Sequence, residues 1–179
     1  MSTQPTIKKD IIALREEWRK LPAYGCFWSS PDNERGLRLT PKIEPGKASV
    51  EMTIEREHSG YPGIAHGGIA FTIVDGLMSW YLMSHEGRAG FTTQMTTTYK
   101  GPLKVGGRYL FEVTLNQEVQ SPAGFVALLG RVYNANDPVT ARQPLIEMRG
   151  QFILPNRSLA KKVLGIELGK HGEDLFPEV

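Results

Sequence analysis

Residues 60–83 read Gly60-Tyr-Pro-Gly-Ile-Ala-His66-Gly67-Gly68-Ile-Ala-Phe-Thr-Ile-Val-Asp75-Gly-Leu-Met-Ser-Trp-Tyr-Leu-Met83, and this stretch decides the fold. It opens with turn-forming residues and then becomes the most apolar segment of the chain. Such a segment predicts one helix, over 67–84, that is buried on nearly all sides. Asp75 lies in its middle, and a buried carboxylate is costly unless something compensates for it. Either a structural partner or a function must therefore explain this acid.

The turn His66-Gly67-Gly68 at the start of the predicted helix suits the binding of an anion. Its backbone N–H groups lack partners within the helix, and glycine has no Cβ to keep a ligand away. A helix N-terminus and a lone carboxylate together suit acyl chemistry, in which a carbonyl oxygen becomes negative. His66 and Asp75 are nine residues apart, which on a helix is about 13–14 Å of rise and half a turn. One carbonyl can meet both only if Asp75 comes from a second subunit.

The remaining chain predicts an α+β domain with about six antiparallel strands. The clearest strand alternates Ala48, Val50, Met52 and Ile54 with polar residues, and the five threonines between 90 and 100 favour a strand over a helix. Because both faces of the apolar helix need covering, the sheet is expected to wrap around it. The predicted elements outside 67–84 are a helix at about 10–21, an irregular connector at 23–36, two strands around Pro45-Gly46, a loop at 57–65, strands at 90–100, 108–117, 125–134 and 145–154, and a short helix near 158–164.

Composition excludes several classes of function. The chain has 179 residues, enough for one domain, and its net charge of +2 comes without a Lys/Arg run that would indicate nucleic-acid binding. Cys26 is the single cysteine, and no signal-peptide pattern or membrane-spanning run occurs, so we expect a cytoplasmic protein without a membrane partner. The four histidines lack metal-ligand spacing, and no Gly-x-Ser-x-Gly elbow is present.

An ordered set of residues resembles the hotdog-fold thioesterases, and within them the PaaI-like and thioesterase-superfamily-member group. The set is His66-Gly67-Gly68, Asp75, Thr92, Tyr99, Pro102 and Gly106. The resemblance covers about residues 25–155 and implies a single hotdog domain over 1–179, with an extra N-terminal helix and a tail at 156–179. Many relatives have Asn or Gln where Gly60 stands, and Glu or Thr where Gly76 stands.

The resemblance implies that this protein hydrolyses an acyl-CoA thioester. The N–H of Gly67 or Gly68 would hold the carbonyl oxygen, with His66 beside it. Asp75 of the neighbouring subunit would act as base or nucleophile, and Thr92 would position Asp75 or the water. The assembly would be a homodimer or a homotetramer, with no metal and no cofactor apart from the coenzyme A of the substrate.

Further side chains are candidates for substrate binding. Phe71, Met78 and Leu82 share the helix face of Asp75 and are expected to contact the acyl group, unless they are core residues. Lys100 and Lys104 are candidates for the phosphates of coenzyme A, unless they form a solvated rim. Thr92 has a plainer interpretation as a strand former. Two other functions stay open: a non-catalytic acyl-CoA or lipid-binding hotdog module, and a hydratase of the same fold.

Overall fold

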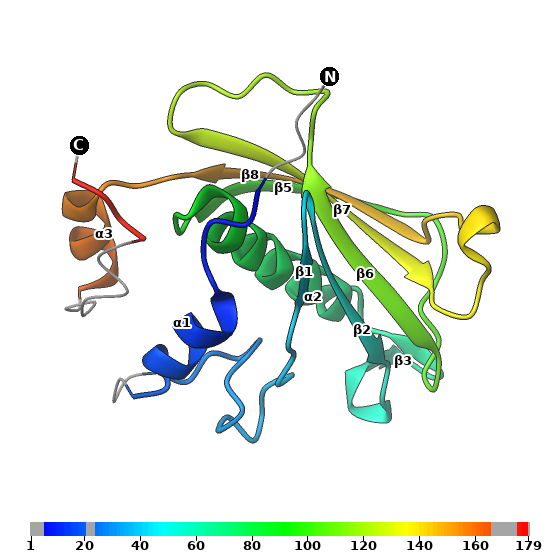
Figure 1. Cartoon of the computed structure of the whole chain (residues 1–179). Coiled ribbons are helices and arrows are strands. Elements are labelled where there is room, and N and C mark those ends of the chain that lie inside the picture. The colour runs from blue at the N-terminus through cyan, green and yellow to red at the C-terminus, as the bar shows by residue number, and fades with distance from the viewer. Residues whose placement is uncertain (1–5, 21–23, 166–174, 179) are drawn as a thin grey trace.

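The computed structural model describes residues 6–20, 24–165 and 175–178. One six-stranded antiparallel sheet, in the order β1-β2-β6-β7-β8-β5, lies against the long helix α2 (Figure 1). In chain order the elements are α1 (Ile11–Trp18), β1 (Lys42–Glu44), β2 (Lys47–Thr53), η1 (Arg56–His58), β3 (Ser59–Tyr61), β4 (Ile64–Ala65), α2 (Gly67–Tyr81), η2 (Leu82–Glu86), β5 (Phe91–Tyr99), β6 (Arg108–Leu115), β7 (Phe125–Asn134), η3 (Val139–Ala141), β8 (Ile146–Ile153) and α3 (Arg157–Leu164). The predicted sheet and the central helix are confirmed.

Helix α2 begins and ends at residues that the sequence marks. His66 is its N-cap, and its last turn continues as the π-helical η2 up to Gly87, whose φ of 66° is left-handed. Between these ends, Ile73, Val74 and Leu77 have no exposed surface. The helix is therefore fixed by burial against the sheet, since its own residues include the poor helix formers Gly76 and Ile73.

The sheet wraps around α2 as expected, with β2, β6, β7, β8 and β5 all in contact with it, and leaves one side of the helix uncovered. The N-terminal segment covers the other side, and Figure 1 shows α1 on the far side of α2 from the sheet. The indole of Trp28 is 4% exposed and donates a hydrogen bond of 2.9 Å to the carbonyl of Ile73. It occupies the space that a Cβ at Gly76 would need. Residues from this segment, namely Ile11, Leu14, Trp28 and Leu39, thus complete the core.

The segment expected to be a loop, 57–65, is instead a short turn followed by a hairpin. The strands β3 and β4 pair antiparallel around Pro62 and Gly63, and Gly63 has a φ of 75°. The hairpin was missed because its strands have three and two residues and carry no alternating apolar pattern. It stands directly before the N-terminus of α2 and helps to form the cleft described below.

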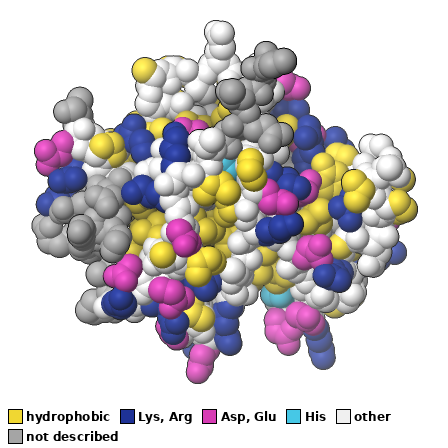
Figure 2. Space-filling view, in the orientation of Figure 1, with side chains coloured by type: hydrophobic (Ala, Val, Ile, Leu, Met, Phe, Trp, Pro, Cys, Tyr) yellow, Lys and Arg dark blue, Asp and Glu magenta, His cyan; other side chains and the backbone are white. Residues whose placement is uncertain are grey.

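The other elements follow the predictions closely. Asp10 caps α1 through hydrogen bonds from Ile12 and Ala13, but the helix ends at Trp18 and so is shorter than the expected 10–21, of which residue 21 lies outside the described residues. Of the expected tail at 156–179, residues 166–174 and 179 also lie outside them. In the described part of the chain, no helix has both the length and the apolar character needed to cross a membrane. Figure 2 shows basic and acidic side chains interspersed over one face of the molecule.

Candidate active site

The N-terminus of α2 is arranged by His66 itself. Its Nδ1 accepts a hydrogen bond of 3.0 Å from the N–H of Gly68, so the neutral ring carries its proton on Nε2. A Cβ at Gly68 would lie 2.9 Å from the same Nδ1, which explains the glycine. The N–H of Gly67 has no acceptor among the described residues. Of the two predicted oxyanion donors, Gly67 is therefore the one whose N–H remains available to a ligand.

Tyr99, at the end of β5, fixes the first residue of the helix. Its hydroxyl donates a hydrogen bond of 3.1 Å to the carbonyl of Gly67. A Cβ at Gly67 would lie 3.0 Å from that hydroxyl, tighter than ordinary contacts. Tyr99 belongs to the sequence pattern, but the pattern does not show that Tyr99 contacts the turn. Strand β5 therefore touches the turn directly.

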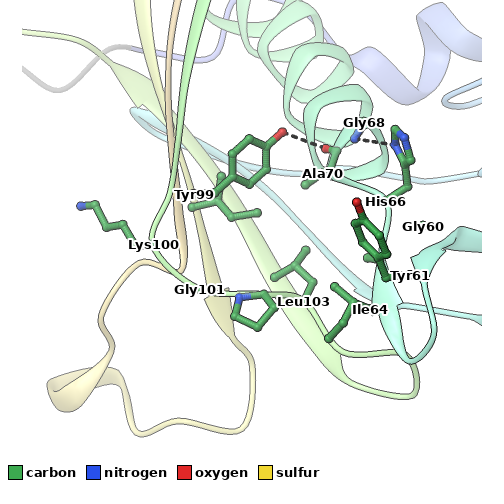
Figure 3. Close-up of a pocket in the computed structure, with 14 residues that line it drawn as sticks. Gly60, Tyr61, Ile64, His66, Gly68, Ala70, Tyr99, Lys100, Gly101 and Leu103 are labelled. Carbon is green, nitrogen blue, oxygen red and sulfur yellow. Dashed lines mark hydrogen bonds between the residues drawn. The ribbon is translucent and has the colours of Figure 1, made fainter.

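A cleft of about 920 Å³ opens in front of this turn. Figure 3 shows the rings of Tyr61 and Tyr99 on either side of it, with His66 and the first residues of α2 at its inner end. It is lined by Gly60, Tyr61, Ile64, Ala65, His66, Gly67, Gly68, Ala70, Tyr99, Lys100, Gly101, Pro102, Leu103 and Ile146. Asp75 and Thr92 are not part of it, so within one chain the predicted base lies outside the cleft.

Asp75 and Thr92 form a pair of their own. The Thr92 hydroxyl donates a hydrogen bond of 2.8 Å to Oδ1 of Asp75. Strand β5 is irregular just after Thr92, where the pairing with β8 slips between Thr92 and Gln94. Such bulges change the direction of a side chain. Asp75 is partly exposed in the single chain, which corrects the expectation that it is buried.

The three apolar candidates have different surroundings. Phe71 is 37% exposed, whereas Met78 and Leu82 have no exposed surface. The Sδ of Met78 would lie 2.7 Å from a Cβ at Gly150, so Met78 packs closely on β8. The predicted contact of Met78 and Leu82 with an acyl group remains a prediction, and their burial in the chain favours the core interpretation.

The two lysines also differ. Lys100 lines the cleft and lies 3.8 Å from Glu147, while Lys104 is exposed and does not line the cleft. Burial of Glu147 acts to raise the pKa of its carboxyl, but the cations of Lys100, Arg149 and Arg131 outweigh it and lower that pKa. Glu147 therefore stays ionised and offsets part of the positive charge that Lys100 would offer to a phosphate.

Comparisons with known proteins match the segment of the chain that carries this site. Residues 62–118, which contain the turn, Asp75 and Thr92, match the Thioesterase superfamily. The chain is 40% identical over 63 residues to "Acyl-coenzyme A thioesterase 13" of Homo sapiens, a match that covers 35% of this chain and 45% of that protein. The mouse protein of the same name is 38% identical over the same length. The chain thus spans about half the length of these curated relatives.

Solved structures show the same fold over most of the chain. The zebra fish thioesterase superfamily member 2 superposes with a TM-score of 0.61 at 21% identity, over 82% of this chain and 99% of that one. A Streptococcus mutans protein bound to acetyl CoA gives a TM-score of 0.57 at 18% identity, over 75% of this chain and 95% of that one. The architecture is therefore the hotdog fold, and the segment that carries the site has the sequence pattern of the thioesterase superfamily.

Proposed function

We propose that this protein is an acyl-CoA thioesterase whose active site is shared between two subunits. The observation that carries the proposal is the division of the site within one chain. The cleft holds the free N–H of Gly67 beside His66, while the Asp75–Thr92 pair lies outside it. The relatives named acyl-coenzyme A thioesterase support the reaction class.

Strand β5 offers the surface on which two copies can meet. It is the last strand of the sheet, and its nine residues pair with β8 on one side only within the described residues. A long open strand edge invites pairing with another chain. All nine residues of β5, among them five threonines and Tyr99, are exposed or partly exposed in the single chain, so this edge is accessible. This supports a homodimer formed through β5, or a homotetramer.

Antiparallel pairing of two β5 strands about a two-fold axis would complete the site. Thr92 and Tyr99 lie near opposite ends of β5. In such a pair the Thr92 end of one copy faces the Tyr99 end of the other. Because Thr92 bonds Asp75 and Tyr99 bonds Gly67, the carboxylate of one copy then approaches the glycine turn of the other.

The chemistry follows from these positions. The thioester carbonyl oxygen accepts a hydrogen bond from the Gly67 N–H at the positive end of α2. Asp75 of the other subunit either removes a proton from a water that attacks the carbonyl carbon, or attacks that carbon itself to form a mixed anhydride that water then hydrolyses. In both routes one proton of the water ends on the departing sulfur and its oxygen ends in the acid. The carbon–sulfur bond breaks, coenzyme A leaves as its thiol, and the acyl group leaves as the free acid. Thr92 holds the carboxylate in place.

The remaining candidates would bind the rest of the substrate. Phe71, exposed beside the helix face of Asp75, would contact the acyl group, and Met78 and Leu82 would shape the wall behind it. Lys100 and Lys104, on the segment after β5, would meet the phosphates of coenzyme A.

The test is a panel of short, long and aromatic acyl-CoAs with detection of free thiol. The wild type should release coenzyme A from at least one of them, and Asp75→Ala should lose most of this activity while keeping its circular dichroism spectrum. Tight binding of acyl-CoA without thiol release would favour the binding module. Addition of water to an enoyl-CoA without thiol release would favour the hydratase.

A further inference from the structure

Tyr61 lines the cleft and has no part in the mechanism proposed above. Its side chain is 79% exposed, so the ring gains little from packing within the chain. Figure 3 shows its hydroxyl directed toward the His66 end of the cleft rather than away from it. An exposed tyrosine alone is common on protein surfaces. What distinguishes Tyr61 is the rigidity of its support and the polar groups around it.

The hairpin that carries Tyr61 is fastened to the body by its backbone. The N–H of Ala65 donates 2.8 Å to the carbonyl of Leu103, and the N–H of Val105 donates 3.0 Å to the carbonyl of Gly63. The next residue, His66, donates its N–H to the carbonyl of His58 at 2.8 Å. These bonds fix the hairpin relative to the N-terminus of α2. The backbone of the hairpin is therefore fixed at the edge of the cleft, and from there the Tyr61 side chain lines it.

Most polar hydrogens at the inner end of the cleft already have acceptors, but the hydroxyl hydrogen of Tyr61 does not. The N–H of Gly68 is donated to His66, and the hydroxyl of Tyr99 is donated to the carbonyl of Gly67. The Tyr61 hydroxyl has no acceptor in the part of the chain that is described. A developing oxyanion is best stabilised by more than one preorganised donor. The Gly67 N–H supplies one, and a second is still needed.

The residue before Tyr61 cannot supply that donor. Gly60 has no side chain, and a Cβ there would lie 3.0 Å from the Cα of His66 and 3.2 Å from its Cδ2. Any larger side chain at position 60 would therefore press on the His66 ring and disturb the bond to Gly68. The hairpin instead brings a polar group to the cleft from position 61.

We propose that the Tyr61 hydroxyl donates a hydrogen bond to the thioester carbonyl oxygen and shares with the Gly67 N–H the negative charge that develops on it. Tyr61 is then a catalytic residue of the site. This role rests on the proposed thioesterase function. Its effect belongs to the transition state, so it appears in kcat more than in KM.

The test compares Tyr61→Phe, which keeps the ring, with Tyr61→Leu, which removes ring and hydroxyl, on the best acyl-CoA of the panel. Loss of one oxyanion donor typically lowers kcat by about 10²-fold. We expect that loss for both variants, with KM changed little. Ser59→Ala is the matched control, because it removes a hydroxyl of the same hairpin that bonds Arg56 instead of facing the cleft. It should keep wild-type kcat.

Each of the following results would overturn the assignment. Wild-type kcat for Tyr61→Phe, combined with a loss for Tyr61→Leu, would show that the ring packs on the substrate and the hydroxyl is not needed. Equal losses for Ser59→Ala and Tyr61→Phe would indicate damage to the hairpin. If the wild type releases no thiol, both the thioesterase function and the role of Tyr61 are wrong. If the wild type turns over and Tyr61→Phe is unaffected, only the role of Tyr61 is wrong.

Discussion

At the scale of single residues, one hydrogen bond joins two members of the predicted motif, Asp75 on α2 and Thr92 on β5. Thr92 is one of five threonines between 90 and 100, and its neighbours behave as ordinary strand residues. Thr93, for example, donates its hydroxyl to the carbonyl of Gln151 on the neighbouring strand. The resemblance singled out Thr92 from this group, and the structure gives the physical difference: its hydroxyl bonds the Asp75 carboxylate across 17 residues of sequence.

We therefore predict that Thr92→Val lowers kcat by about 10-fold or more, since a bond to a charged carboxylate is worth about 1.5–3 kcal/mol and its loss frees Asp75 to rotate. Valine keeps the branched shape that suits a strand. Thr92→Ser, which retains a hydroxyl, should recover much of the activity, and steady-state kinetics would measure both. Thr96→Val is the matched control on the same exposed strand. A loss in Thr96→Val as large as that in Thr92→Val would assign the effect to the strand edge instead.

At the scale of elements, the sequence predicted the parts whose pattern is long. The fifteen residues of α2 and the alternation along β2 gave clear periodicities, and both elements stand where they were expected. The hairpin of β3 and β4 was missed because five residues cannot show a period. The covering of α2 by Trp28 was missed for a different reason, since it joins residues 45 apart in an irregular connector. For the candidate site, the sequence pointed to the turn His66-Gly67-Gly68, whose residues are adjacent. It did not point to Tyr61, which the hairpin brings to the cleft.

The contact between Trp28 and Gly76 reverses an ordinary rule of helix stability. Alanine normally stabilises a helix by about 1 kcal/mol relative to glycine. Here a Cβ at position 76 would run into the Trp28 indole. We predict that Gly76→Ala destabilises the protein by about 1–3 kcal/mol through overpacking. Urea unfolding at a fixed protein concentration would measure it.

A double-mutant cycle isolates this contact. Trp28→Ala should destabilise the protein on its own, because it removes a buried ring and the bond to the Ile73 carbonyl. In that background the penalty of Gly76→Ala should disappear, and alanine should become the better residue. A stabilising Gly76→Ala in the wild-type background would contradict the packing of Trp28 on α2.

At the scale of the whole molecule, one chain forms the hydrophobic core by itself but holds the parts of the proposed active site away from one another. The sheet and the N-terminal segment bury α2 within one subunit. The cleft and the Asp75–Thr92 pair remain apart, at opposite ends of the open strand β5. The nine-residue spacing of His66 and Asp75 already indicated this division. Two residues about 13–14 Å apart along one helix, and half a turn apart, cannot both reach the same carbonyl. Assembly is therefore the level at which the proposed activity arises.

A pair of variants can test the shared site without disturbing the helix. Gly67 is the first helical residue of α2, where proline is well tolerated, and His66 before it has an extended ψ of 131°, which suits a following proline. Gly67→Pro thus removes the N–H donor while the helix can keep its backbone conformation, and it adds a Cβ. Gly67→Ala carries the same Cβ next to Tyr99 but keeps the N–H, so it is the matched control. Gly67→Pro should lose about 10²-fold in kcat relative to Gly67→Ala.

The last prediction concerns hybrids of Gly67→Pro and Asp75→Ala. Each variant alone disables both sites of its own homodimer, so both should be nearly inactive. Light scattering should first show that the chain is at least a dimer. Unfolding and refolding the two variants together should create hybrids in which one site combines an intact Asp75 with an intact turn, while the other is doubly broken. Equal mixing should restore about a quarter of wild-type activity, because half of the dimers are hybrids and each holds one complete site. A monomer in solution, or proven hybrids as inactive as their parents, would show that Asp75 and the glycine turn do not meet across an interface.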